Sequence, residues 1–160
     1  MTSDMKIKFL IVPAFLLIGM TVFSQQLTPD KVPAGIRQVF TKNFPAAKSI
    51  QYHKEKDVYI AAFLMGDKQC AASIDATGKL IETERGLDAA GLPLEVRNAV
   101  KQKFSGYTIM DAVRREAIDK GVCYEMDLKK DHAGFQVRFS PKGEILMKVA
   151  MSDEVKIIRK

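Results

Sequence analysis

The chain is poor in the side chains that most often carry chemistry. Its 160 residues include two histidines, two cysteines and no tryptophan. His53 and His132 stand far apart, and neither cysteine has a histidine or a second cysteine at the short spacing that zinc ligands need. We therefore expect no metal and no other cofactor, and we interpret both histidines as solvated surface imidazoles.

Motifs of catalysis are missing as well. The sequence has no Gly-x-Ser-x-Gly elbow, no glycine-rich loop that would cradle a phosphate and no dinucleotide fingerprint. A cysteine-dependent enzyme centred on Cys123 would need a histidine brought beside the thiol by the fold. An unpaired surface thiol is the simpler interpretation. We predict that the protein is not an enzyme and has no catalytic residue.

The first 24 residues have the pattern of a signal peptide. Lys6 and Lys8 give a positive start, residues 9–23 are mostly apolar, and small residues precede a cleavage point between Ser24 and Gln25. An uncleaved membrane anchor is the alternative, but the apolar run is shorter than the roughly 20 residues of a span. We expect cleavage, a periplasmic or secreted location, and no stable membrane span afterwards.

Export raises the question of a disulfide, because an oxidising compartment permits one. Strand alternation predicts that Cys70 points inward together with Ala72. Cys123 is predicted to point outward beside Glu125 and Asp127. Two cysteines on opposite faces of a sheet do not easily meet, so a disulfide is the less favoured alternative.

One pattern of elements occurs twice along the chain. Residues 32–84 and 92–151 each begin with an amphipathic helical segment whose first turn contains a proline, Pro33 and Pro93. Each then continues with four short segments of strand type joined by tight turns. We predict strands at 49–54, 58–65, 68–75, 80–85, 109–117, 122–129, 133–140 and 145–150.

This duplication predicts an α+β fold, a tandem repeat of a helix plus a four-stranded antiparallel meander. The two units, at about 30–86 and 87–151, would together form a roughly eight-stranded sheet with both helices on one face. A mature chain of residues 25–160 suits a single domain. The other face of the sheet would then be open.

Several stretches of the chain resemble a known family. They are the helix VPxxIxxxFxxxFP, the strands DVYIAAFL and GVCYEMDL, the hairpins IDATGKLIETE and RFSPKGEILMKV, and the signal-peptide end FSQQ. Together they are similar to the PepSY-like periplasmic proteins of Bacteroides-type bacteria, whose fold is likened to that of the β-lactamase-inhibitor protein. The resemblance covers essentially the whole mature chain. It implies tandem helix-plus-four-strand units and an exported, non-enzymatic role in binding or inhibiting another protein through the sheet face.

Basic residues outnumber acidic ones by 25 to 19, a formal net charge of +6. Lysines and arginines on the predicted strands and turns could form a basic surface, although acidic residues are interspersed among them. Export separates the protein from nucleic acid, so we expect no nucleic-acid partner. Anionic lipid, acidic glycan and acidic protein remain as partners of such a surface, and a solvated face without a partner is the simpler interpretation.

The open sheet face is the predicted site, because the two halves of the chain differ there. Alternation places apolar side chains outward in the first half and charged ones outward in the second, a combination that suits a protein interface. We predict that this face sequesters or inhibits an unknown envelope or secreted protein. The anchors would be Tyr59 and Phe63, and the polar partner-binding residues Glu125, Asp127 and Arg138.

Two other uses of the same face stay open. Residues 155–158 or a neighbouring subunit could cover its apolar half, and the second case would make the protein a homodimer. The chain would then be a structural or accessory envelope protein without a specific client. A Cys-dependent enzyme is the third and least favoured hypothesis.

Overall fold

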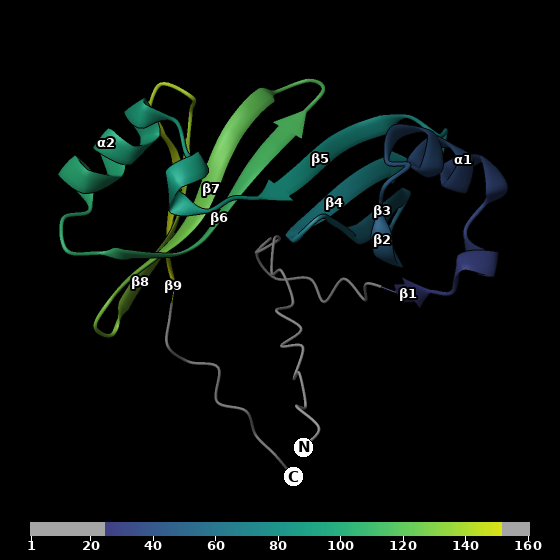
Figure 1. Ribbon diagram of the computed structural model, residues 1–160, viewed down its shortest axis with the longest axis horizontal. Coiled ribbons are helices and arrows are strands. Elements are labelled where there is room, and N and C mark those ends of the chain that lie inside the picture. Colours follow the sequence, from purple (N-terminus) through teal and green to yellow (C-terminus); the bar gives the residue numbers. More distant parts are fainter. Residues whose placement is uncertain (1–24, 152–160) are drawn as a thin grey trace, which may run out of the picture.

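A single antiparallel sheet of nine strands in chain order dominates the computed structural model, which describes residues 25–151 (Figure 1). The strands are β1 Gln25–Leu27, β2 Lys48–Glu55, β3 Val58–Met65, β4 Lys68–Asp75, β5 Leu80–Gly86, β6 Thr108–Ala117, β7 Gly121–Lys130, β8 Ala133–Phe139 and β9 Ile145–Met151. The helices are α1 Ala34–Asn43 and α2 Leu94–Lys103, each preceded by a short 3-10 helix, η1 Pro29–Lys31 and η2 Ala89–Gly91. The described part of the chain is therefore mostly β.

The predicted α+β tandem repeat of a helix plus a four-stranded meander is wrong. A ninth strand, β1, pairs with β2, and β5 pairs with β6 in the middle of the sheet. The hydrogen-bonded ladder therefore runs unbroken from β1 to β9, and the α-helices described beside it are two of ten residues each. β1 has three residues, too few for alternation to reveal it from sequence.

Two predictions about the ends of the chain are not addressed by this sheet. The signal peptide at 1–24 and the covering segment at 155–158 lie outside the described residues. That residues 25–160 form one domain stays a prediction. Within residues 25–151, neither helix is long and apolar enough to cross a membrane.

Local sequence signals account for the strand boundaries. Gly66 and Asp67 form the turn between β3 and β4, and Gly66 has a φ of 63°, which glycine adopts at little cost. Asp75 closes the β4–β5 turn, because its Oδ1 accepts the backbone N–H groups of Thr77 at 2.9 Å and Lys79 at 3.0 Å. The predicted strands from 49–54 to 145–150 agree with β2 to β9 to within one or two residues.

Each helix covers its own hydrophobic cluster on the sheet. α1 buries Ile36 and Phe40, and the Phe40 ring lies 5.0 Å from that of Phe63, edge to face. α2 buries Val96 and Val100 against residues of β7 and β8. The strand registers place both clusters on the same face, which we call the helix face. Figure 1 shows α1 near β2 and β3 and α2 at the opposite end, with β5 and β6 between them.

The middle of the helix face is polar. Thr83 and Arg85 of β5 lie opposite Glu116 and Arg114 of β6, and Arg114 pairs with Glu116 at 2.8 Å. The two hydrophobic clusters are therefore separate. The opposite face of the sheet, which we call the open face, is not covered by any helix of residues 25–151.

Candidate functional site

Charged side chains from four consecutive strands meet at the centre of the open face. Glu84 of β5 is the direct cross-strand partner of Arg115 of β6, and Glu125 of β7 is that of Arg138 of β8. Glu82 lies two residues before Glu84 and shares its face. These five side chains are the ionic cluster.

Arg115 is the centre of the ionic cluster. Its guanidinium contacts Glu82, lies 2.9 Å from an oxygen of Glu84 and 3.3 Å from Oε2 of Glu125. Arg138 donates from Nε and Nη2 to Oε2 of Glu125, at 2.9 and 2.6 Å. Although neither described helix covers this face, Arg115 is only 8% exposed and Glu125 only 7%. The cluster is thus shielded by its own packing, and such charged hydrogen bonds are strong.

Negative charge is in excess at the ionic cluster. Three carboxyl groups face two guanidinium groups, and Asp127 beside them lies opposite Asp111 across β6 and β7. Burial raises the pKa of Glu84 to about 7 in spite of Arg115, and the neighbouring carboxyl of Glu82 adds to the rise. This acidic surface stands out on a chain whose net charge is +6.

The other ionisable groups of this face respond to the same surroundings. Burial raises the pKa of Asp127, and Asp111 and Glu125 raise it further. Burial alone would lower the pKa of Arg115, but Glu82 and the other two carboxylates outweigh it and raise that pKa. The guanidinium of Arg115 therefore stays charged.

An apolar strip lies on the open face next to the ionic cluster. It consists of the outward side chains of β3, which are Val58, Ile60, Ala62 and Leu64, all half-buried. Ala62 lies opposite Ala71 of β4, and β4 in turn pairs with β5, which carries Glu82 and Glu84. An apolar region and an acidic region therefore adjoin on one face of the sheet.

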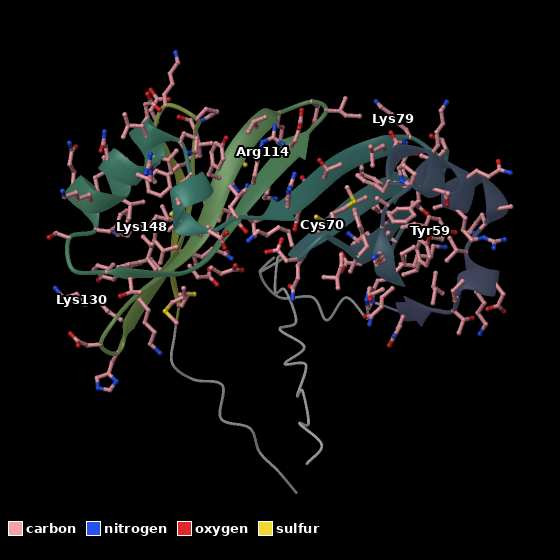
Figure 2. The ribbon with its side chains drawn as sticks, in the orientation of Figure 1. Tyr59, Cys70, Lys79, Arg114, Lys130 and Lys148 are labelled. Atoms are coloured by element: carbon pink, nitrogen blue, oxygen red, sulfur yellow. The ribbon has the colours of Figure 1, made fainter. Side chains whose placement is uncertain are left out.

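The predicted outward placement of Tyr59 and Phe63 is wrong. Phe63 is 4% exposed and packs between the rings of Phe40 and Phe44. Tyr59 packs against the same cluster, with Nζ of Lys54 5.2 Å from its ring centroid, and Figure 2 shows it at the α1 end. Both side chains point to the helix face, away from the ionic cluster.

Strand β3 misleads because it is apolar on both faces. The two-residue turn between β3 and β4 pairs Met65 with Lys68, and this register sets Phe63 opposite Cys70. Because Cys70 is predicted to point inward, the turn already implies that Phe63 does so as well. Ile60 and Leu64 of the apolar strip could have been found in this way.

The three charged residues of the prediction do lie together on the open face. Glu125, Asp127 and Arg138 occupy neighbouring positions of β7 and β8. The sheet separates them from Tyr59 and Phe63. Their role in binding a partner stays a prediction. Sequence alternation could not reveal Arg115 as the centre, because its contacts to Glu82 and Glu84 depend on the pairing of β5 with β6.

The two cysteines lie on opposite faces of the sheet, and both thiols are free. Cys70 packs against the cluster below α1, whereas Cys123 lies opposite Arg115 on the open face. Burial raises the pKa of the Cys123 thiol, and the arginines beside it do not reverse this. A thiol with a raised pKa is a weak nucleophile at neutral pH.

Metal ligands are not gathered among residues 25–151. No three side chains of His, Cys, Asp or Glu in this range are placed to hold an ion. A hollow of about 560 Å³ lies beside α2, lined by Arg97, Lys101, Phe104 and Tyr107 among others. It is shallow, lies away from the ionic cluster and has no histidine, cysteine or carboxylate in its lining, so we place the candidate site on the open face.

No family model matches the chain, and neither does any curated protein. Solved structures of similar shape come from Bacteroides species, each at 19% sequence identity. A Bacteroides eggerthii protein provisionally described as periplasmic has a TM-score of 0.72 over 78% of this chain and 93% of its own. A DUF2874 family protein from Bacteroides uniformis scores 0.70 over 74% and 89%.

A BLIP-like protein from Bacteroides fragilis is also similar, with a TM-score of 0.68 over 79% of this chain and 89% of its own. At this level of identity the similarity shows a shared fold, and the fold agrees with the likeness to the β-lactamase-inhibitor protein that the sequence motifs indicated. Membership of the PepSY-like family stays a prediction.

Proposed function

We propose that this chain is an exported, non-enzymatic binding module that sequesters or inhibits a protein partner on the open face of its sheet. The observation that carries the proposal is the acidic excess of the ionic cluster on the same face as the apolar strip, with only strand β4 between them. Protein interfaces combine an apolar centre with polar and charged groups around it. Both features are present on the face that is free of the helices found in residues 25–151.

The chemistry of this face indicates what the partner would present. The apolar strip suits one or two aliphatic or aromatic side chains. The carboxyl groups of Glu84 and Asp127, whose pKa values are raised, would be stabilised as carboxylates by a cation from the partner. We therefore expect a partner segment that carries a lysine or arginine next to apolar residues, with charge complementarity that favours association.

Several observations support a non-enzymatic, exported role. Burial raises the pKa of the Cys123 thiol although Arg138 and Arg115 lower it, whereas a cysteine nucleophile needs a lowered pKa or a histidine base beside it. The Bacteroides eggerthii neighbour carries a provisional periplasmic description, and the Bacteroides fragilis neighbour is described as BLIP-like. Both agree with the signal-peptide pattern of residues 1–24.

The test begins with capture of a partner from envelope extract on the chain from Gln25 to Lys160, followed by purification of that partner. The Kd is then measured for wild type and for two open-face variants, Ile60→Asp and Asp127→Asn. We expect each variant to weaken binding about tenfold or more, and added salt to weaken the wild-type complex.

The matched controls make the same kinds of substitution at exposed residues away from the open face. Leu94→Asp changes an exposed apolar residue of α2, and Glu116→Gln changes an exposed acid of β6. Neither should alter the Kd. Unchanged binding by both open-face variants would show that the partner docks elsewhere. Failure to capture any specific client would favour the structural or accessory role.

A further inference from the structure

Strand β9 forms a long edge of the sheet with which no other strand of the described residues pairs. Within residues 25–151, β9 pairs only with β8, and it has seven residues against three for β1 at the other edge. Ile145, Leu146 and Val149 of β9 are 38%, 56% and 37% exposed. Proteins usually protect such an edge with charge, proline or a short strand. β9 contains no proline and one charged residue, Lys148.

Lys148 does not protect this edge. Its Nζ lies 4.2 Å from the ring centroid of Phe135 and 5.6 Å from that of Phe104, so the ammonium group is held against the helix face (Figure 2). The backbone donors and acceptors on the outer edge of β9 thus have no partner strand within residues 25–151, and the Lys148 charge is not beside them.

The regular part of β9 has a symmetric pattern. Leu146 is the extra residue where the register with β8 shifts, and Met147 to Met151 pair without interruption. Val149 is the midpoint of this stretch. Met147 and Met151 flank Val149 on the open face, whereas Lys148 and Ala150 point to the helix face.

We propose that two copies of this chain join edge to edge through β9, antiparallel, with Val149 of each copy on the two-fold axis. In this register Val149 meets Val149 of the second copy, and Met147 meets Met151, so the open-face side chains form an apolar ladder. Lys148 meets the small Ala150. A two-fold axis at Lys148 would instead set two ammonium groups opposite each other.

This self-complementarity selects a second copy as the occupant of the edge. A two-fold interface needs a surface that is complementary to a second copy of itself. The stretch centred on Val149 meets this condition, because its apolar side chains face apolar ones and its one lysine faces a small alanine. The sheet would run continuously through both copies, with both open faces on the same side. The dimer is independent of the partner proposed above and would present that partner with two sites.

The first experiment measures the mass of the chain from Gln25 to Lys160 by sedimentation equilibrium over a range of concentrations. We expect a dimer for wild type and a monomer for Val149→Lys, which places two charges at the axis. Leu94→Lys is the matched control, because Leu94 is exposed on α2, and it should remain dimeric. Circular dichroism checks that each variant is folded.

The second experiment tests the register itself. Cross-strand neighbours lie close enough for a disulfide, so Val149→Cys should form a covalent dimer on mild oxidation, seen on a non-reducing gel. Leu94→Cys, with the same native cysteines, should not. A wild-type chain that stays monomeric, a dimer that survives Val149→Lys, or a Val149→Cys chain that does not cross-link more than Leu94→Cys would overturn the proposal. Binding of a foreign strand to a monomeric chain would do so as well.

Discussion

Arg115 of β6 and Glu84 of β5 are direct cross-strand partners whose charged atoms lie 2.9 Å apart. They meet where the two hydrophobic clusters of the helix face do not reach each other. The ionic cluster therefore stabilises the fold in addition to forming part of the candidate site, because its side chains link β5 to β6 in the middle of the sheet, where neither hydrophobic cluster does.

Replacing Arg115 should destabilise the fold. Arg115→Ala leaves Glu82, Glu84 and Glu125 close together without the guanidinium that they surround. We expect the free energy of unfolding to fall by about 3 kcal/mol, as for other buried pairs that lose one partner. Denaturant titration measures it. Arg114→Ala is the control, because its pair with Glu116 is exposed and should contribute less than about 1 kcal/mol. Equal effects of the two variants would contradict the central role of Arg115.

Glu84 should make stability depend on pH. Its pKa is raised from 4.5 to about 7 in the folded chain, so folding favours the protonated carboxyl. This contribution is fully present below about pH 4.5 and is lost as the pH rises through 7. Glu84→Gln stays neutral at every pH. We expect the variant to be more stable than wild type at pH 8, by up to about 3 kcal/mol.

The measurement for Glu84 is the free energy of unfolding of both proteins at pH 5 and pH 8. Glu116→Gln, on the exposed part of the helix face, should leave the wild-type difference between the two pH values unchanged. A Glu84→Gln chain with the same pH dependence as wild type would show that Glu84 is not the group responsible.

Phe63 and Leu64 are adjacent in sequence but should behave differently, because they lie on opposite faces of β3. Phe63→Ala removes a ring packed against Phe40 and Phe44, and should cost about 3 to 5 kcal/mol of stability. Leu64→Ala trims a half-buried side chain of the apolar strip and should cost about 1 kcal/mol. Thermal and denaturant unfolding give both values. A reversed order would restore the outward placement of Phe63.

Gly143 should not tolerate a side chain. A Cβ at this position would lie 2.6 Å from the backbone oxygen of Glu95 in α2, and its φ is 78°. Gly143→Ala should therefore force α2 away from the β8–β9 turn and destabilise the fold by about 2 kcal/mol or more. Gly66→Ala is the control, because Gly66 has a similar φ of 63° with nothing within 4 Å of a Cβ. It should cost about 1 kcal/mol, and comparable losses would contradict the clash.

Local patterns in the sequence predict much of the secondary structure. The prolines at 33 and 93 precede the two helices, and glycines at 66, 78 and 143 lie in turns between strands. The strand predictions succeed because alternation and turn chemistry depend on neighbours in the chain. The predicted fold class fails because the size and continuity of the sheet depend on pairings between strands, such as β1 with β2. Local patterns in the sequence do not indicate which strands pair.

The sequence by itself determined where strands β2 to β9 begin and end, that Cys70 and Cys123 lie on opposite faces, and that chemistry-bearing residues are few. The tertiary structure alone decided what the open face presents. Arg115 meets Glu82 from 33 residues away, and Phe63 turns inward because of its register with β4. Side chains alternate with period two, so a strand that is apolar on both faces leaves its orientation to the partner strand. For the same reason, only the assembled sheet brings the acidic excess beside the apolar strip.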